Sequence, residues 1–502
     1  MQIERQNFLF KFSLILLFAV FAFQLGKHVN DFYVPESDFF DFREKAVTLR
    51  NLDWPESFKR PPLYSATIAL VSTFIPGRHR ELYAAEFIGI ISVLASLLLI
   101  YKIAFHFFGR NAVFLAWLWA FHPSTLRMAI KPKSEILVTV LILWAFYLFV
   151  KERKWAYFIA FVASCVRYEG ALAIAAVGVA DFITRKEKFK TIAYSLLAGA
   201  FIVLWTLMQS GGGDGESYFS YFESYKPNIA FLRSFWEALI GFLPDALHKY
   251  NVLLCAILML CGYVFGFQKY KRSTIGLGVF FIGFLTMHIA WPMPNFDYQI
   301  LVVWNALLVF GLGVAWLAQK KLFSTTLSNA LQNKGAVVVS GVFLAAVIVT
   351  LFRLPLSFPQ YRVSIGQWLF IAAPAVLVLF AIFSKAGKIK TGPVLAILLI
   401  LSPILFSMLS DANALFYSIR FSKAEFRSVG EWFKENSAPT DKLAIEQPVV
   451  VEYYSQLNAD SFVHLVDLPK VDADSLHSWC IENGVTHIAW LTANSLFETD
   501  NA

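Results

Sequence analysis

Long apolar segments recur along most of this chain, and they restrict its fold more than any other feature. About 20 apolar residues in a helix cross the hydrocarbon core of a bilayer, and a segment exposed to lipid must satisfy its own backbone hydrogen bonds. Hydrophobic residues make up 58% of the 502 residues and charged residues only 16%, whereas soluble domains average about 25% charged residues. The sequence therefore predicts an α-helical polytopic membrane protein.

We predict about 13 transmembrane helices from these segments. The clearest candidates are residues 8–26, 83–105, 135–150, 191–209, 251–267, 274–290, 299–318, 336–352, 368–383 and 392–409, and the shorter ones are 112–124, 155–167 and 170–183. The first segment lacks a cleavage site of small residues and more spans follow it. It is therefore interpreted as an anchoring helix rather than a signal peptide.

Basic residues in the connecting loops predict the orientation. Cytoplasmic loops collect Lys and Arg, and alternate loops here are short and basic, as in Lys151–Lys154, Arg185–Lys190, Lys269–Arg272 and Lys385–Lys390. With the N-terminus inside, all of these loops lie inside. An odd number of spans then brings the C-terminus outside.

Residues 155–183 could instead form a single span. That span would put Lys151–Lys154 and Arg185–Lys190 on opposite faces of the membrane. It would also bury Arg167 and Glu169 at mid-membrane, which is costly. We therefore predict two short helices, joined at the outer face by a turn over Arg167-Tyr-Glu-Gly170.

The last part of the chain differs from the rest. Residues 411–502 hold 14 acidic against 6 basic residues, although the whole chain carries a net charge of +8. An apolar stripe with helical spacing runs from Phe426 to Phe433, and short strand and helix patterns alternate after it. We expect residues 1–410 to form the transmembrane domain and residues 411–502 a small extracytoplasmic α/β domain with a partly parallel sheet.

The first outer loop, residues 27–82, places acids beside fixed cations. Asp38 and Asp41 lie three residues apart and would share one face of a helix. A carboxylate at this position could act as a general base or hold a divalent cation. The alternative is that both are solvated loop acids, and their spacing does not decide between these interpretations.

Basic residues on the predicted outer face run against the positive-inside bias. Guanidinium and ammonium groups bind phosphate oxygens, so Arg60, Lys131, Lys133 and Arg167 are candidates to bind a lipid-linked phosphate. Interfacial anchoring of these side chains is the alternative.

Five segments, taken in order, resemble the GT-C glycosyltransferases, which include the protein O-mannosyltransferases and the lipid A aminoarabinose transferases. They are Asp38-x-x-x-Phe42-x-x-x-Ala46 with Arg60-Pro-Pro-Leu-Tyr64, Glu86 through Arg110, Pro123 through Lys133-Ser-Glu135, Arg167-Tyr-Glu-Gly170, and the tail with Ala424 through Phe433 and Val485-Thr-His-Ile488. Together they cover nearly the whole chain, although each motif is individually loose.

The resemblance implies a glycosyltransferase that moves a sugar from a polyprenyl-phosphate carrier to a lipid, glycan or protein acceptor at the outer face of a bacterial cytoplasmic (inner) membrane. Asp38 matches the acid that serves as the base. Arg60 stands where relatives place a cation against the donor phosphate. The other residues expected to bind substrate are Asp41, Tyr64, Lys131, Lys133, Glu135, Arg167, Glu169 and Tyr298.

The chain departs from this pattern at Phe296-Asp297-Tyr298, where relatives often carry an Arg-Tyr pair. Lys131, Lys133 and Arg167 are therefore the candidates for the cation that completes the phosphate site. Several relatives use a metal, and a divalent cation stays open as a cofactor here. Its metal ligands are unknown, since Gly211 through Glu216 offers oxygens but is more simply a solvated loop.

A polytopic transporter or lipid flippase is the alternative function. Transporters keep ionisable groups near the membrane midplane, usually within internal repeats. This sequence shows no repeat, and its charges cluster toward one face. His288 is the best buried polar candidate, which a hydrogen-bonded core histidine also explains. The expected partners are the lipid-linked donor, the acceptor and membrane lipids, and no nucleic acid.

Overall fold

The computed structural model describes most of the helical part and much of the tail. The described residues are 34–35, 37–55, 60–129, 131–210, 248–290, 296–319, 424–465 and 473–489, with isolated positions before residue 23. The predicted spans at 336–352, 368–383 and 392–409, and almost all of 8–26, lie outside these residues.

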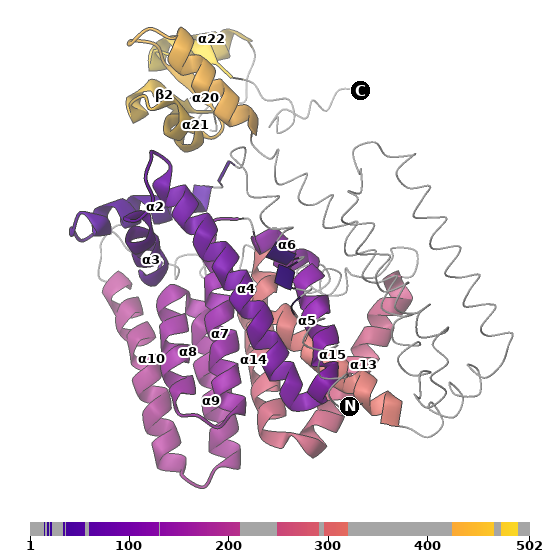
Figure 1. Cartoon of the computed structure of the whole chain (residues 1–502). Helices are drawn as coiled ribbons and strands as arrows, with labels where there is room; N and C mark the ends of the chain where they lie inside the picture. Colours follow the sequence, from indigo (N-terminus) through magenta and orange to yellow (C-terminus); the bar gives the residue numbers. More distant parts are fainter. Residues whose placement is uncertain are drawn as a thin grey trace, which may run out of the picture.

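Helices dominate the described residues (Figure 1). They are α2 (Ser37–Arg50), α3 (Leu63–Ser72), α4 (Arg80–Phe108), α5 (Ala112–Phe121), α6 (Pro123–Ala129), α7 (Ser134–Val150), α8 (Trp155–Val166), α9 (Ala171–Thr184), α10 (Lys188–Ser210), α13 (His248–Lys269), α14 (Lys271–Ala290) and α15 (Ile300–Gln319). Short 3-10 turns are η1 (Gly109–Asn111), η2 (Tyr168–Gly170) and η4 (Phe296–Gln299).

Four stretches of the described helices are long and apolar enough to cross a membrane. They are Arg80–Phe108, Lys188–Leu207, Lys271–Ile289 and Asp297–Leu317, and shorter apolar helices include Ser134–Val150 and Trp155–Val166. The prediction of two helices over residues 155–183 is confirmed, because α8 ends at Val166 and α9 begins at Ala171. The total of about 13 spans stays a prediction.

Aromatic packing holds the helices together on the inside. Phe146 of α7, Phe280 of α14 and Trp304 of α15 are buried, and their ring centroids lie 4.8 to 5.6 Å apart. The outer surface is also apolar: Leu196 and Leu197 of α10 are 69% and 76% exposed. A helix bundle with an apolar exterior is suited to lipid rather than water.

Successive helices run up and down, so their connections gather at two ends of the bundle (Figure 1). We call one of these the basic-loop end; it holds the turns at residues 109–111, 151–154, 185–187 and 270. The hydroxyl of Tyr270 donates to the carbonyl of Phe107 at 3.1 Å, and Arg272 donates to the carbonyl of Phe149 at 2.9 Å. Three of the loops predicted to share one face, Lys151–Lys154, Arg185–Lys190 and Lys269–Arg272, therefore lie at the same end, and Lys385–Lys390 lies outside the described residues.

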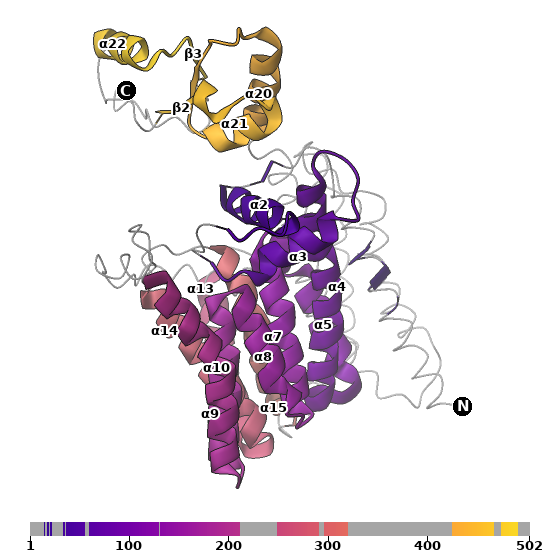
Figure 2. The same cartoon turned by 90° about the vertical axis from the view of Figure 1, so that its left-hand side faces the viewer.

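The opposite end carries the first loop and the tail (Figure 2). The first loop is itself helical, forming α2 and α3, which the sequence patterns did not predict. In the tail, α20 (Ala424–Asn436), β1 (Leu443–Ile445), α21 (Pro448–Ser455), β2 (Phe462–His464), α22 (Ala473–Asn483) and β3 (His487–Ile488) follow one another. Among the described residues the strands form one sheet in the order β2-β1-β3, and both pairs are parallel.

Candidate active site

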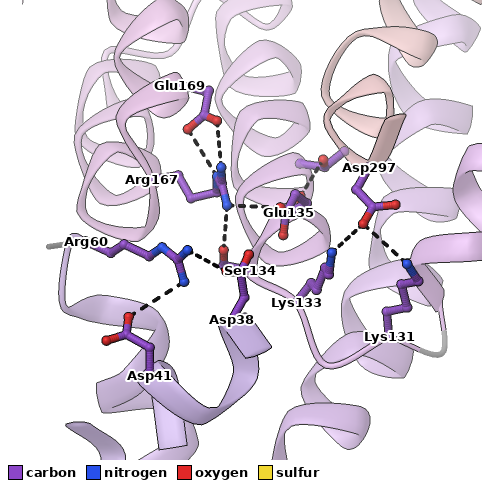
Figure 3. Close-up of polar contacts among 11 residues, drawn as sticks. Asp38, Asp41, Arg60, Lys131, Lys133, Ser134, Glu135, Arg167, Glu169 and Asp297 are labelled. Atoms are coloured by element: carbon purple, nitrogen blue, oxygen red, sulfur yellow. Dashed lines mark hydrogen bonds and ion pairs between the residues drawn. The ribbon is translucent and has the colours of Figure 1, made fainter. Parts of the chain in front are cut away.

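The two acids of the first loop lie on one face of α2, as their spacing predicted. The Arg60 guanidinium donates to Asp38 Oδ1 at 2.8 Å, and its second terminal nitrogen lies 3.6 Å from Asp41 Oδ2 (Figure 3). Lys45, one turn further along α2, donates to Asp41 Oδ1 at 2.7 Å. One cation therefore bridges both acids, and the side chains of Asp38 and Asp41 stay 43% and 36% exposed.

Asp38 is ionised in this setting. Partial burial raises the pKa of its carboxyl. The charge and hydrogen bond of Arg60, together with the charges of Lys133 and Arg167, lower this pKa by more than burial raises it. The pKa of Asp38 therefore lies below its usual value. The carboxylate is charged at neutral pH and open enough to accept a proton.

Arg60 is oriented by aromatic rings as well as by the acids. Its guanidinium carbon lies 4.9 Å from the centre of the Phe42 ring, in cation–π geometry. The Tyr64 ring meets Phe42 edge to face, with centroids 4.8 Å apart. Tyr64 is 1% exposed, and within the described residues its hydroxyl has no hydrogen-bond partner. Phe42 and Tyr64, two of the residues in the first motif, thus form the wall behind Arg60.

Arg167 lies between two buried carboxylates (Figure 3). It donates twice to Glu169, at 2.8 and 3.1 Å, and once to Glu135 at 3.0 Å. The hydroxyl of Ser134 accepts a further bond at 3.1 Å, and the Tyr298 ring lies 5.1 Å from the guanidinium carbon. The predicted turn therefore joins the start of α7 and η4 in one network.

Glu169 shows the electrostatic effect of that pairing. Burial raises the pKa of its carboxyl, but the charge and hydrogen bonds of Arg167 lower the pKa by a larger amount. The pKa of Glu169 therefore lies below its usual value. Arg167 and Glu169 therefore form a charged pair. Buried ion pairs of this kind persist only when hydrogen bonds satisfy the remaining polar atoms.

Gly170 allows the turn to approach α8 closely. A Cβ at this position would overlap the backbone of Ala163 and Ser164. Glycine is the residue that permits such an approach. It therefore fixes how far Arg167 and Glu169 project from the end of α8.

Lys131 and Lys133 share one acid. Both ammonium groups contact Asp297 Oδ2, Lys131 at 3.3 Å and Lys133 at shorter range (Figure 3). All three side chains are buried. Asp297 thus supplies a counter-charge that sequence analysis did not assign.

Sequence analysis also missed Lys45, Ser134 and His288 as members of this region. The His288 ring stacks on Phe284 with centroids 4.0 Å apart and meets Tyr298 at 5.1 Å. Lys45 could have been found from its four-residue spacing to Asp41, because oppositely charged residues at that spacing face each other on a helix. Ser134 and His288 had no such local signal.

The described residues contain no group of three or more His, Cys, Asp or Glu side chains placed to hold a metal ion. The segment Gly211 through Glu216, which offers oxygens but was interpreted as a solvated loop, lies outside the described residues. At the candidate site Asp38 and Asp41 are partly exposed acids, and Arg60 and Lys45 already pair with them. A divalent cation therefore stays an open prediction.

Comparison with solved structures shows the same fold in two kinds of protein. ArnT from Cupriavidus metallidurans bound to undecaprenyl phosphate matches with a TM-score of 0.52 and 14% identity, over 94% of this chain and 89% of that chain. The archaeal oligosaccharyltransferase AglB from Archaeoglobus fulgidus, in complex with an inhibitory peptide and a dolichol-phosphate, matches with a TM-score of 0.50 and 12% identity, over 96% and 69%.

No family model matches this sequence, and no curated protein sequence does. The resemblance to GT-C glycosyltransferases is nevertheless confirmed at the level of the fold, since ArnT and AglB both belong to that superfamily. At 14% identity or less, the match concerns the architecture and not the chemistry of individual residues.

Proposed function

We propose that this chain is a membrane glycosyltransferase that moves a sugar from a polyprenyl-phosphate carrier to an acceptor hydroxyl. The observation that carries the proposal is Asp38, a half-exposed and ionised carboxylate held by Arg60. It belongs to a helix at one end of a bundle that shares its fold with ArnT bound to undecaprenyl phosphate.

The reaction can be written with Asp38 as the base. Asp38 takes the proton from the acceptor hydroxyl while the acceptor oxygen attacks the anomeric carbon. The bond between that carbon and the phosphate oxygen breaks, and polyprenyl phosphate leaves with the bonding electrons. Attack from the face opposite the phosphate inverts the anomeric carbon.

Arg60 is proposed to stabilise the leaving phosphate. A guanidinium fork matches phosphate oxygens, and neutralising their charge makes the phosphate a better leaving group. In the described structure Arg60 bonds to Asp38, so a bound phosphate would share or take over that contact. Asp38 would then be released toward the acceptor at the moment the donor arrives.

The remaining candidates take supporting roles in this proposal. Lys133 and Arg167 add positive potential at Asp38, and the buried hydroxyl of Tyr64 is available to a sugar or phosphate oxygen. Glu135, Glu169 and Tyr298 hold Arg167 in place. Lys131 and Lys133 bind phosphate only if it competes with Asp297.

The proposed orientation of the protein in the membrane rests on the different charge of the two ends of the bundle. The basic-loop end is proposed to face the cytoplasm and the candidate site to face the outside, with about 13 spans and an extracytoplasmic α/β domain over residues 411–502. The membrane is proposed to be the bacterial cytoplasmic membrane.

The test is to incubate the purified protein in detergent with a panel of polyprenyl-phosphate sugars and to measure released polyprenyl phosphate. We expect release with at least one sugar. Glu44→Gln is the matched control for Asp38→Asn, since Glu44 is an exposed acid on the same helix as Asp38. No release with any donor, by protein that remains folded, would refute the proposal and favour the transporter alternative.

A further inference from the structure

The helix that carries Asp38 and Asp41 has a second face, which contacts the tail. Phe40 and Arg43 each lie two residues after one of these acids, which is about 200° around a helix axis. The Phe40 side chain is 7% exposed. The acids and these two residues therefore project from opposite sides of α2.

Tyr453 of α21 is the residue that covers this second face. Its ring meets Phe40 edge to face, with centroids 5.4 Å apart, and the Arg43 guanidinium carbon lies 4.9 Å from its centre. Aromatic pairs and cation–π contacts of this geometry are favourable beyond simple burial. α2 is thus held between Arg60 on one side and Tyr453 on the other.

The segment just before α4 fixes α21 from another direction. Arg78 donates to the carbonyls of Tyr453 and Tyr454 at 3.1 and 3.2 Å. These carbonyls belong to the last turn of α21, where backbone acceptors lack partners within the helix and the helix dipole is negative. A guanidinium is therefore well matched to this end of α21.

His79 adds a polar contact to the same junction. Its Nδ1 lies 2.6 Å from the Tyr453 hydroxyl. Burial and the charges of Arg78, Arg427 and Arg43 hold the pKa of His79 below its usual value, against the opposing effect of Glu81. The imidazole is neutral at neutral pH, so the tyrosine hydroxyl can donate to it.

We infer that α21 positions α2 for catalysis, with Tyr453 as the positioning residue that holds the Asp38 face against Arg60. This inference rests on the proposed function. It assigns the tail a part in the reaction itself, in addition to any part in acceptor binding. Small displacements of a reacting group can cost a large share of a rate, so an element that fixes α2 from behind controls how Asp38 meets the acceptor.

The experiment compares the full-length protein with Tyr453→Ala, Tyr453→Phe and Arg78→Ala. Tyr453→Phe keeps the ring against Phe40 and Arg43 but loses the hydroxyl. Arg78 is exposed, so its loss removes the contact to α21 without opening a core. Trp432→Ala is the control, because Trp432 belongs to the same tail and is 50% exposed.

Two quantities are measured for each variant. Hydrogen exchange of the backbone amides in α2 reports whether the helix is held, and kcat and KM for the donor report catalysis. For Tyr453→Ala we expect exchange in residues 37–50 to become about tenfold faster and kcat to fall about tenfold with an unchanged KM. Tyr453→Phe should restore most of kcat, Arg78→Ala should be intermediate, and Trp432→Ala should match the wild type.

The outcomes separate this inference from the proposed function. A wild-type protein without transferase activity refutes the proposed function, and with it the positioning role. An active wild type in which Tyr453→Ala changes neither exchange nor kcat refutes the inference alone. Faster exchange with an unchanged kcat also overturns it, because α2 would then be loosened without consequence for the reaction.

Discussion

The two ends of the helical bundle both contain buried ion pairs, but they use them differently. At the basic-loop end, Asp181 accepts hydrogen bonds from Arg185 at 2.9 Å, Arg272 at 2.6 Å and the Tyr157 hydroxyl at 3.2 Å. Asp181 is 3% exposed. This carboxylate is enclosed by donors and ties α8, α9 and α14 together.

At the candidate site the acids are also paired, but Asp38 remains 43% exposed. In the proposed reaction its partner Arg60 exchanges this carboxylate for the donor phosphate. Burial and pairing alone therefore do not identify a reactive site. The difference is that the Asp38 carboxylate remains open to solvent, whereas Asp181 is enclosed by its donors.

The largest expected effect is on sugar transfer at the candidate site. Asp38→Asn should lower sugar transfer by about 10²–10⁴-fold, because the amide cannot accept a proton. Asp41→Asn should be milder, and Glu44→Gln should be neutral. The measurement is transfer rate at matched amounts of folded protein. Full activity of Asp38→Asn together with an inactive Asp41→Asn would move the base by three residues.

Replacing the enclosed acid Asp181 should lower stability and leave catalysis unchanged. Asp181→Asn leaves Arg185 and Arg272 without their carboxylate, and breaking such a buried pair costs about 3–5 kcal/mol. We expect a lower free energy of unfolding in detergent but an unchanged rate per folded molecule. A loss of kcat in molecules that remain folded would mean that the two ends do not differ as described.

Variants of Arg60 test whether its guanidinium binds the donor phosphate through two nitrogens. Arg60→Ala should lower carrier release by about 10²-fold or more, and Arg60→Lys should be intermediate, since lysine keeps the charge but not the bidentate geometry. Rates are measured with one polyprenyl-phosphate donor. Wild-type release by both variants would make Arg60 an interfacial anchor.

The smallest effect expected is on the pH profile. Asp38 must be ionised to act, and its lowered pKa places the acid limb of kcat/KM below the usual aspartate range. Arg60→Gln removes the cation that lowers this pKa and leaves the burial that raises it, so the limb should move to higher pH. An acid limb at the same pH in both proteins would contradict Asp38 as the titrating group.

Local patterns in the sequence were enough to predict part of the fold and part of the candidate site. The loop charges predicted the turn at Arg167 and the grouping of the basic loops, because membrane insertion restricts where charges can lie. The spacing of Asp38 and Asp41 would bring both acids to one face of any helix that carried them, although the helix itself was not predicted. The strands and helices of the tail followed from short alternating patterns.

The remaining contacts depend on residues far apart in the chain. Lys131 and Lys133 meet Asp297 across 166 and 164 positions, and Arg78 meets Tyr453 across 375. No local period encodes such pairs, since they arise from helix packing. The helices α2 and α3 were not predicted for a related reason: α2 is polar on average, and its second face is covered by the tail.

Donor binding to the Asp38→Asn protein tests the central claim most directly. If Asp38 acts on the chemistry, this variant should bind the polyprenyl-phosphate sugar at least as tightly as the wild type, because Arg60 is freed from a competing anion, and the donor should be recovered intact. If Asp38→Asn instead loses donor binding while Glu44→Gln keeps it, Asp38 only holds Arg60 in place, and the open carboxylate is not the base.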